Sequence, residues 1–321
     1  VKGLPASPGS AAGKAHVILD PSKIEEFKEG EILVTTMTAP DWVPAMKKAR
    51  AIVTDAGGMT CHASIVSREL GIPCIVGTKS RSVEATTTIP DGADITVDAT
   101  NGIVYEGTVA DIVKPKEEAA QAGGQATVVM SEPVPITGTK IYMNLGNPDL
   151  AEKHGKLPCD GIGLMREEFI WTTFIHEHPL YLIEIGHPER VVDQLADGMR
   201  KVCQALAPRP VTLRLSDFKS SEYRNLKGGD KYEPQESSAL LGWRGASRYY
   251  DPKYVAAFRL ELQAVRKVRE EYGFKNLNVM VPFCRRVDEM EKIVGLMAEE
   301  GLHRGPDFKV WLMAEIPSNI I

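Results

Sequence analysis

The sequence has no long hydrophobic run, no paired cysteines and no excess of positive charge, and each absence excludes a class of protein. No apolar stretch approaches the ~20 residues that a helix needs to cross a bilayer, and residues 1–5 lack the apolar core of a signal peptide. The net charge of −5 argues against binding to nucleic acid or to an anionic membrane. The five cysteines are scattered without a C-x-x-C pair, which argues against a disulfide framework and a thiolate zinc site and indicates a cytoplasmic protein.

The chain is long enough for two domains, and its character changes along its length. Its 321 residues, 43% of them hydrophobic and 25% charged, are ordinary for a globular protein. Residues 1–113 alternate short β-type runs with helical patterns, which predicts a small α/β domain. Residues 114–132 are mostly small or polar and show no buried-face pattern, so they are predicted to form a linker.

Residues 133–321 repeat a strand-then-helix pattern. Five strand candidates end in charged or polar residues, at 140–144, 161–165, 211–215, 279–283 and 310–315. This layout is typical of a (β/α)8 barrel of the TIM type, whose chemistry gathers at the carboxyl ends of the strands. Because five strands do not close a barrel of eight, the sequence predicts an α/β protein with an incomplete barrel, either a fragment or an incompletely ordered chain.

The segment 57–66 has the pattern of a glycine turn between a strand and a helix. The glycine pair 57–58 can adopt backbone angles closed to other residues, Thr60 is predicted to cap the helix and Gly71 to end it. His62 then falls in the first helical turn, where free N–H groups and the helix dipole disfavour the imidazolium and leave a ring nitrogen available as a nucleophile. The same groups would stabilise an anion, such as a phosphoryl group carried on that nitrogen. A histidine that only caps or packs at a helix start is the alternative.

Charged residues at three predicted strand ends indicate a second site. Arg166 and Arg214 lie at the ends of two strands, and Glu315 ends the last one. Two guanidinium groups suit bidentate binding of a phosphate or carboxylate, and a carboxylate suits Mg²⁺. Arg–Glu pairs that only brace neighbouring loops are the alternative interpretation of each residue taken alone.

Four segments resemble signatures of the PEP-utilising enzymes. The segment with His62 is similar to the family's phosphohistidine signature, and three later segments are similar to its G-I-G-L-x-R-x-E, R-x-x-D-x-K-x-x-E-Y and L-G-W-R-G-x-x-R motifs. The four segments span residues 54–68, 161–169, 214–223 and 240–248. Glu167 stands where threonine is more usual in the family.

The resemblance implies a role for each candidate residue. His62 would be the residue that is transiently phosphorylated. Arg166, Arg214 and Arg244 would bind phosphoenolpyruvate or pyruvate. Glu315 would be one ligand of a Mg²⁺ cofactor.

The resemblance also implies how the parts work together. Residues 1–113 would be a swivelling phosphohistidine domain, and residues 133–321 would be part of the PEP/pyruvate-binding barrel of a homo-oligomer. Regulatory phosphorylation would fall on Thr60, where added negative charge would repel the incoming phosphoryl group. Relative to the family, the chain lacks the ATP-grasp domain, for which ATP is the co-substrate, and the last barrel strands. The fragment itself is therefore expected to be inactive.

Trp243 and Cys61 make the sequence most similar to the branch of the family that converts pyruvate, ATP and water into phosphoenolpyruvate, AMP and phosphate. Pyruvate phosphate dikinase, which differs in its phosphate acceptor, is the close alternative, because the discriminating residues lie largely outside this chain. A third interpretation is a non-catalytic core of such an enzyme that forms oligomer contacts.

Overall fold

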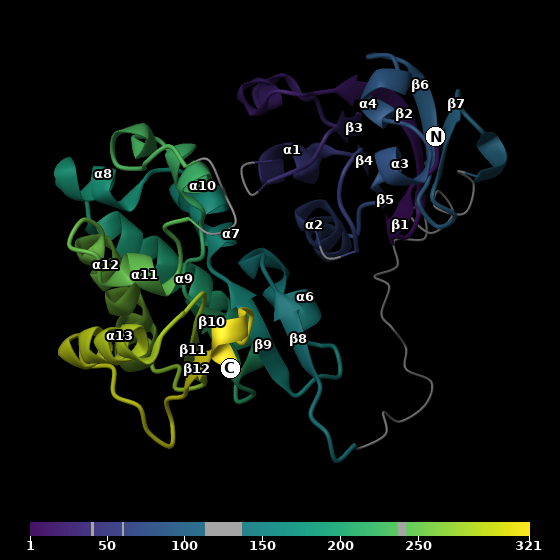
Figure 1. Ribbon diagram of the computed structural model, residues 1–321. Helices are drawn as coiled ribbons and strands as arrows, with labels where there is room; N and C mark the ends of the chain where they lie inside the picture. Colours follow the sequence, from purple (N-terminus) through teal and green to yellow (C-terminus); the bar gives the residue numbers. More distant parts are fainter. Residues whose placement is uncertain (40–41, 60, 113–136, 237–241) are drawn as a thin grey trace. The chain divides into compact units, whose positions relative to one another are not determined.

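The structure, a computed structural model, describes residues 1–39, 42–59, 61–112, 137–236 and 242–321. The chain divides into two compact units, Val1–Val134 and Pro135–Ile321, each with its own sheet and helices (Figure 1). Both units are α/β, as the sequence predicts. The predicted linker, 114–132, lies outside the described residues and stays a prediction. None of the described helices combines the length and the apolar composition that a bilayer crossing requires.

The first unit is built on a seven-stranded sheet in the order β1-β5-β4-β3-β2-β6-β7. The four central strands run parallel, and the edge strands pair antiparallel. The strands are β1 (Leu4–Ser7), β2 (Ser10–Val17), β3 (Ile32–Thr35), β4 (Ala51–Thr54), β5 (Cys74–Val76), β6 (Asp94–Asp98) and β7 (Ile103–Glu106). The helices are η1 (Pro21–Glu26), α1 (Val43–Lys48), α2 (His62–Leu70), α3 (Thr78–Arg81) and α4 (Ala85–Thr88).

Continuous burial of the central strands positions the first candidate site. Strands β3, β4 and β5 are buried along their whole length, which is expected of parallel strands with both faces covered. Helix α2 packs against β4 and β5. Because the chain leaves β4 and then enters α2, the start of α2 lies beyond the carboxyl end of a central strand.

The second unit is built on an all-parallel sheet in the order β12-β11-β10-β9-β8, so each strand lies beside the next one in the chain. The strands are β8 (Tyr142–Leu145), β9 (Gly161–Arg166), β10 (Val211–Arg214), β11 (Leu277–Val281) and β12 (Val310–Leu312). All five overlap the segments predicted from the sequence. Repeated βα units produce this neighbour order, while closure into a barrel stays a prediction.

The unit has three long helices, α9 (Glu189–Leu206), α12 (Val255–Arg266) and α13 (Val287–Glu299). Helix α9 contacts both β10 and α12, and it buries Leu195, Met199 and Val202 at helical spacing. Each such side chain contributes roughly 1.5–3 kcal/mol when fully buried. The shorter elements are η3 (Pro148–Leu150), α6 (Ala151–His154), α7 (Glu168–Ile170), η4 (Trp171–Ile175), α8 (Pro179–Glu184), α10 (Ser220–Arg224), η5 (Gly229–Lys231), α11 (Ala246–Tyr249), η6 (Lys267–Glu271) and η7 (Pro317–Asn319).

Candidate functional site

His62 is the first residue of α2 and so lies in the first helical turn, as the sequence predicts, and Thr38 contacts its ring. Thr38 Oγ1, from the loop after β3, lies 2.9 Å from His62 Nδ1. The helix ends at Gly71, whose φ of 69° is left-handed. The N-cap position is occupied by Cys61, so the predicted cap at Thr60 was one residue too early. Thr60 itself lies outside the described residues.

One of the two glycines before His62 is required by the turn. Gly57 has a φ of 113°, and a Cβ built there would lie 2.7 Å from Cys61 Sγ. Gly58 has open space around its Cβ position and no positive φ, so of the pair it is Gly57 that adopts a backbone angle closed to other residues. Its carbonyl accepts a hydrogen bond from Ser64 Oγ at 2.7 Å, which ties the turn to the helix.

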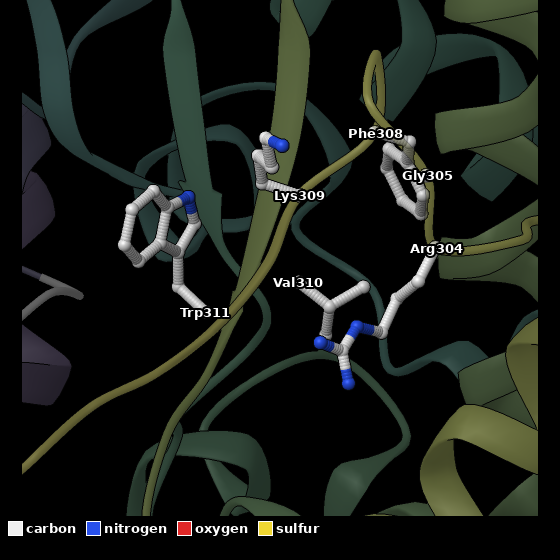
Figure 2. Close-up of a pocket in the computed structure, with 6 residues that line it drawn as sticks. All are labelled: Arg304, Gly305, Phe308, Lys309, Val310 and Trp311. Carbon is white, nitrogen blue, oxygen red and sulfur yellow. The ribbon is translucent and has the colours of Figure 1, made fainter.

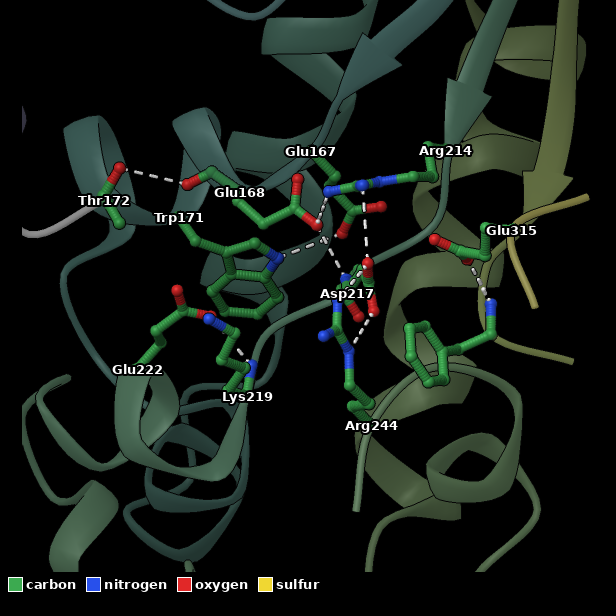
Figure 3. Close-up of polar contacts among 12 residues, drawn as sticks. Glu167, Glu168, Trp171, Thr172, Arg214, Asp217, Lys219, Glu222, Arg244 and Glu315 are labelled. Atoms are coloured by element: carbon green, nitrogen blue, oxygen red, sulfur yellow. Dashed lines mark hydrogen bonds and ion pairs between the residues drawn. The ribbon is translucent and has the colours of Figure 1, made fainter. Parts of the chain in front are cut away.

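In the second unit, two arginines and two carboxylates meet at the carboxyl ends of β9 and β10. We call Glu168, Arg214, Asp217 and Arg244 the strand-end cluster (Figure 3). Arg214 Nη2 donates to Glu168 Oε1 at 2.7 Å, and its Nη1 lies 3.4 Å from Asp217 Oδ2. Arg244 donates from Nε and Nη2 to the two oxygens of Asp217, at 2.9 and 2.7 Å. Asp217 thus lies beside both guanidinium groups.

The parallel register explains why residues distant in sequence meet here. Arg214 on β10 pairs with Arg166 on β9, so Arg166 occupies the neighbouring position at the same edge of the sheet. Glu168 lies two residues after β9, at the start of α7, and Asp217 lies in the loop after β10. The Asp217 N–H donates to Glu168 Oε1 at 2.7 Å and joins the two loops.

The strand-end cluster is formally neutral and combines buried carboxylates with half-buried guanidinium groups. Within the described structure, some of its polar atoms have no hydrogen-bond partner. Burial opposes the charge of Arg214, but Glu168 and Asp217 outweigh it and raise the arginine's pKa. Arg214 Nε and Glu168 Oε2 are buried and have no hydrogen-bond partner in the part of the chain that the structure describes. Because buried polar atoms are nearly always hydrogen-bonded, these atoms indicate a place where water or a ligand binds.

Glu315 reaches the same edge of the sheet from the loop after β12. Its Oε1 accepts the N–H of Phe283 at 2.7 Å. Burial, together with the nearby charge of Asp217, raises the pKa of Glu315 and outweighs the effects of that N–H, Arg214 and Arg244, which lower it. Among the described residues, no three acidic, histidine or cysteine side chains are grouped to hold a metal ion. Mg²⁺ is nevertheless commonly held by one or two carboxylates together with water and substrate phosphate, so Glu315 is compatible with the predicted metal role.

Two further carboxylates, not predicted as site residues, lie behind the strand-end cluster. Glu261 on α12 accepts hydrogen bonds from Ser216 Oγ at 2.5 Å and Ser216 N at 3.3 Å. Burial raises its pKa to about 8 and also raises the pKa of Glu167 well above the ordinary value. Tyr249 OH donates to the Ser216 carbonyl at 2.6 Å. The residue before Asp217 is thereby fixed on two sides.

A pocket of about 600 Å³ lies elsewhere in the second unit. It is lined by Arg304, Gly305, Phe308, Lys309, Val310 and Trp311 (Figure 2). These residues precede or form β12, so most of the pocket lies toward the amino end of that strand. The arginines and Glu315 lie at the carboxyl ends of the strands, so this pocket is not the site that they form.

Comparison with known proteins identifies the family of both units. Residues 27–102 match the PEP-utilising enzyme, mobile domain, and residues 120–321 match the PEP-utilising enzyme, PEP-binding domain. A probable phosphoenolpyruvate synthase of Staphylothermus marinus is 60% identical over 100% of this chain and 39% of its own length. A phosphoenolpyruvate synthase of Aeropyrum pernix is 52% identical with the same coverage, 100% and 39%.

An NMR solution structure of an enzyme I protein aligns with 38% of this chain and 99% of its own, at 16% identity and a TM-score of 0.30, which is too low to carry an argument. The chain spans about 39% of the length of the first two curated relatives it matches. The resemblance predicted from the four motifs is confirmed, and the chain belongs to the PEP-utilising enzymes.

Proposed function

We propose that the chain works within a Mg²⁺-dependent phosphotransferase that makes phosphoenolpyruvate from pyruvate and ATP through a phosphohistidine at His62. The proposal concerns a full-length enzyme, because the chain covers 39% of the phosphoenolpyruvate synthases to which it is similar. The balanced reaction converts pyruvate, ATP and water into phosphoenolpyruvate, AMP and phosphate. Residues 1–113 would carry the phosphoryl group, and residues 133–321 would bind its acceptor in a barrel.

His62 would accept the phosphoryl group on Nε2. Thr38 engages Nδ1 and thereby orients the ring, and Nε2 is the nitrogen that we propose as the nucleophile. A P–N bond forms at the β-phosphorus of ATP as its bond to AMP breaks, and water then releases the γ-phosphate. The N–H groups at the start of α2 would stabilise the phosphoryl group left on the histidine. Thr60, two residues earlier, is proposed as a regulatory phosphorylation site.

The observation that carries the proposal is the pair of arginines fixed at the strand ends by shared carboxylates. Arg214 and Arg244, with Arg166 in the adjacent position, would bind the carboxylate of pyruvate and the oxygens of the transferring phosphoryl group. In the second half-reaction a base of the full-length enzyme takes a proton from the pyruvate methyl group, the P–N bond breaks and an O–P bond forms at the enolate oxygen. Glu315 would hold Mg²⁺, whose positive charge stabilises the enolate and the phosphoryl oxygens when bound.

Transfer of label from [³²P]phosphoenolpyruvate to the full-length protein tests the proposal. The wild type should acquire an acid-labile label, and the His62→Ala variant should not. His16→Ala is the matched control, since His16 lies in the same unit and bonds to Glu31 instead. Retention of the label by His62→Ala would refute the assignment of the carrier residue.

A further inference from the structure

Phe283, two residues after β11, has a backbone conformation that a bulky side chain disfavours. Its φ is +51°, in the left-handed region. Such conformations concentrate at functional sites and persist only where the surroundings enforce them. Phe283 follows the carboxyl end of a strand, at the edge of the sheet where Arg214 and Glu315 also lie, although the sequence assigns it no role.

A close approach of two loops enforces this conformation. Gly245 has a φ of 57°, and a Cβ built there would lie 2.6 Å from Phe283 Cβ and 2.6 Å from the Pro282 carbonyl oxygen. Ala246 donates its N–H to the same carbonyl at 3.0 Å. The loop that carries Arg244 is therefore pressed against the Phe283 backbone, and glycine is the residue that fits between them.

The ring of Phe283 lies beside two arginines. The guanidinium carbon of Arg244 is 4.2 Å from the ring centroid and that of Arg285 is 5.0 Å, both within the range of cation–π contacts. Arg285 in turn donates to Ser247 Oγ at 3.1 Å and to the Gly242 carbonyl at 3.2 Å. Arg285 thus holds the loop 242–247 at its two ends, and the ring of Phe283 contacts Arg244 within it.

The backbone around Phe283 also holds Glu315. The Phe283 N–H donates to Glu315 Oε1 at 2.7 Å. The Glu315 N–H donates to Asn319 Oδ1 at 3.2 Å, and Asn319 Nδ2 donates to the Cys284 carbonyl at 2.7 Å. The loop after β11 therefore fixes Glu315 through its side chain and through its backbone.

We propose that Phe283 is a positioning residue that holds Arg244 against its ring and Glu315 on its N–H, so that both groups face one substrate. The inference rests on the proposed function, because it concerns substrate binding by Arg244. Arg244 and Glu315 come from separate loops and have flexible side chains. Fixing them before the substrate arrives reduces the entropy that binding would otherwise cost.

Two substitutions of Phe283 in the full-length protein test the contribution of its ring while the strain of the backbone stays the same. Leucine, like phenylalanine, is disfavoured at positive φ. Phe283→Leu therefore removes the aromatic ring without relieving the backbone strain. The strength of cation–π contacts predicts a rise of roughly 2- to 30-fold in the KM for pyruvate and in the calorimetric Kd for phosphoenolpyruvate, with kcat changed less. Phe283→Tyr keeps an aromatic ring, so its KM for pyruvate and its Kd for phosphoenolpyruvate should equal those of the wild type. Phe308→Leu is the matched control, because it removes another arginine–ring contact, 4.6 Å from Arg269, near the amino end of β12.

Hydrogen–deuterium exchange reports on the positioning without substrate or metal. In the free protein, exchange of residues 242–247 should rise in Phe283→Leu and stay at the wild-type level in Phe283→Tyr and Phe308→Leu. In an Arg244→Ala background, Phe283→Leu should not raise KM further, because the ring acts through Arg244. Unchanged exchange and KM in Phe283→Leu would overturn the inference if the wild type binds phosphoenolpyruvate. A wild type that does not bind it would instead contradict the proposed function.

Discussion

Replacement of Arg214 by alanine tests whether the strand-end cluster binds an anion. In the intact cluster, the charges of Arg214 and Arg244 balance those of Glu168 and Asp217. The substitution removes one positive charge and leaves two buried carboxylates beside one guanidinium group. The cluster then carries a net negative charge at the place where an anionic substrate has to bind.

Two contributions set the size of the effect. A pair of charge-assisted hydrogen bonds from a guanidinium group to a phosphate or carboxylate contributes roughly 3–6 kcal/mol. Removal of a unit charge at about 5 Å costs about 3 kcal/mol at an effective dielectric constant of about 20. Because these contributions overlap, a total of roughly 4–6 kcal/mol predicts a fall of about 10³- to 10⁴-fold in kcat/KM for pyruvate. Arg214→Lys keeps the positive charge but loses the planar guanidinium group that donates two parallel hydrogen bonds. Its fall in kcat/KM should therefore be smaller than that of Arg214→Ala.

The assay measures the two half-reactions separately in the full-length protein. Arg214→Ala should lose pyruvate-dependent removal of the phosphoryl group from His62 and retain ATP-dependent labelling of His62. Arg200→Ala, which alters an arginine paired with Asp197 on α9, should retain both. Loss of both half-reactions by a folded Arg214→Ala protein would show that the two sites are not separable. Retention of the pyruvate reaction would refute the anion-binding role.

Three further predictions concern other parts of the chain. Thr38→Val should slow labelling of His62 because the hydroxyl that orients the ring is lost, and Thr38→Ser should restore the rate. Gly57→Ala should lower the free energy of unfolding of the first unit by about 2 kcal/mol in denaturant titrations, since its φ is 113°, whereas Gly58→Ala should have little effect. Burial raises the pKa of Glu261 from 4.5 to about 8, so the folded state loses stability as the pH rises between these values. Glu261→Gln should therefore raise Tm more at pH 8 than at pH 5, and an equal shift at both would contradict this.

The long elements could be predicted because their apolar residues recur with a clear period. Helix α9 (Glu189–Leu206) buries apolar residues at helical spacing, and β3 and β4 lie in continuous apolar runs. The ends of short elements follow tertiary contacts instead. Cys61 makes no side-chain capping bond, and Ser64 from within the helix bonds back to the turn, so a capping preference placed the start of α2 at the wrong residue.

Most of the candidate site was predicted from residues at or near the ends of strands, and Arg244 was predicted from its motif alone. Arg166, Arg214 and Glu315 lie at or just after strand ends, and parallel strands bring their carboxyl ends to one edge of the sheet. Glu168 and Asp217 lie within the recognised motifs, but their partners are set by how the two loops fold. Nothing in the sequence indicated that one carboxylate would contact both arginines.

The residues missed by sequence reasoning act through other residues. Asp217 and Glu168 occupy N–H groups of Arg214 and Arg244, so they do not add to the attraction for an anion; they restrict where the guanidinium groups can lie. Glu261 in turn fixes Ser216, the residue before Asp217. Burying these carboxylates costs stability unless each is paired. Their arrangement is therefore better explained by preorganisation of the arginines than by stability, because a site that holds its donors in place stabilises a transition state without reorganising at the moment of reaction.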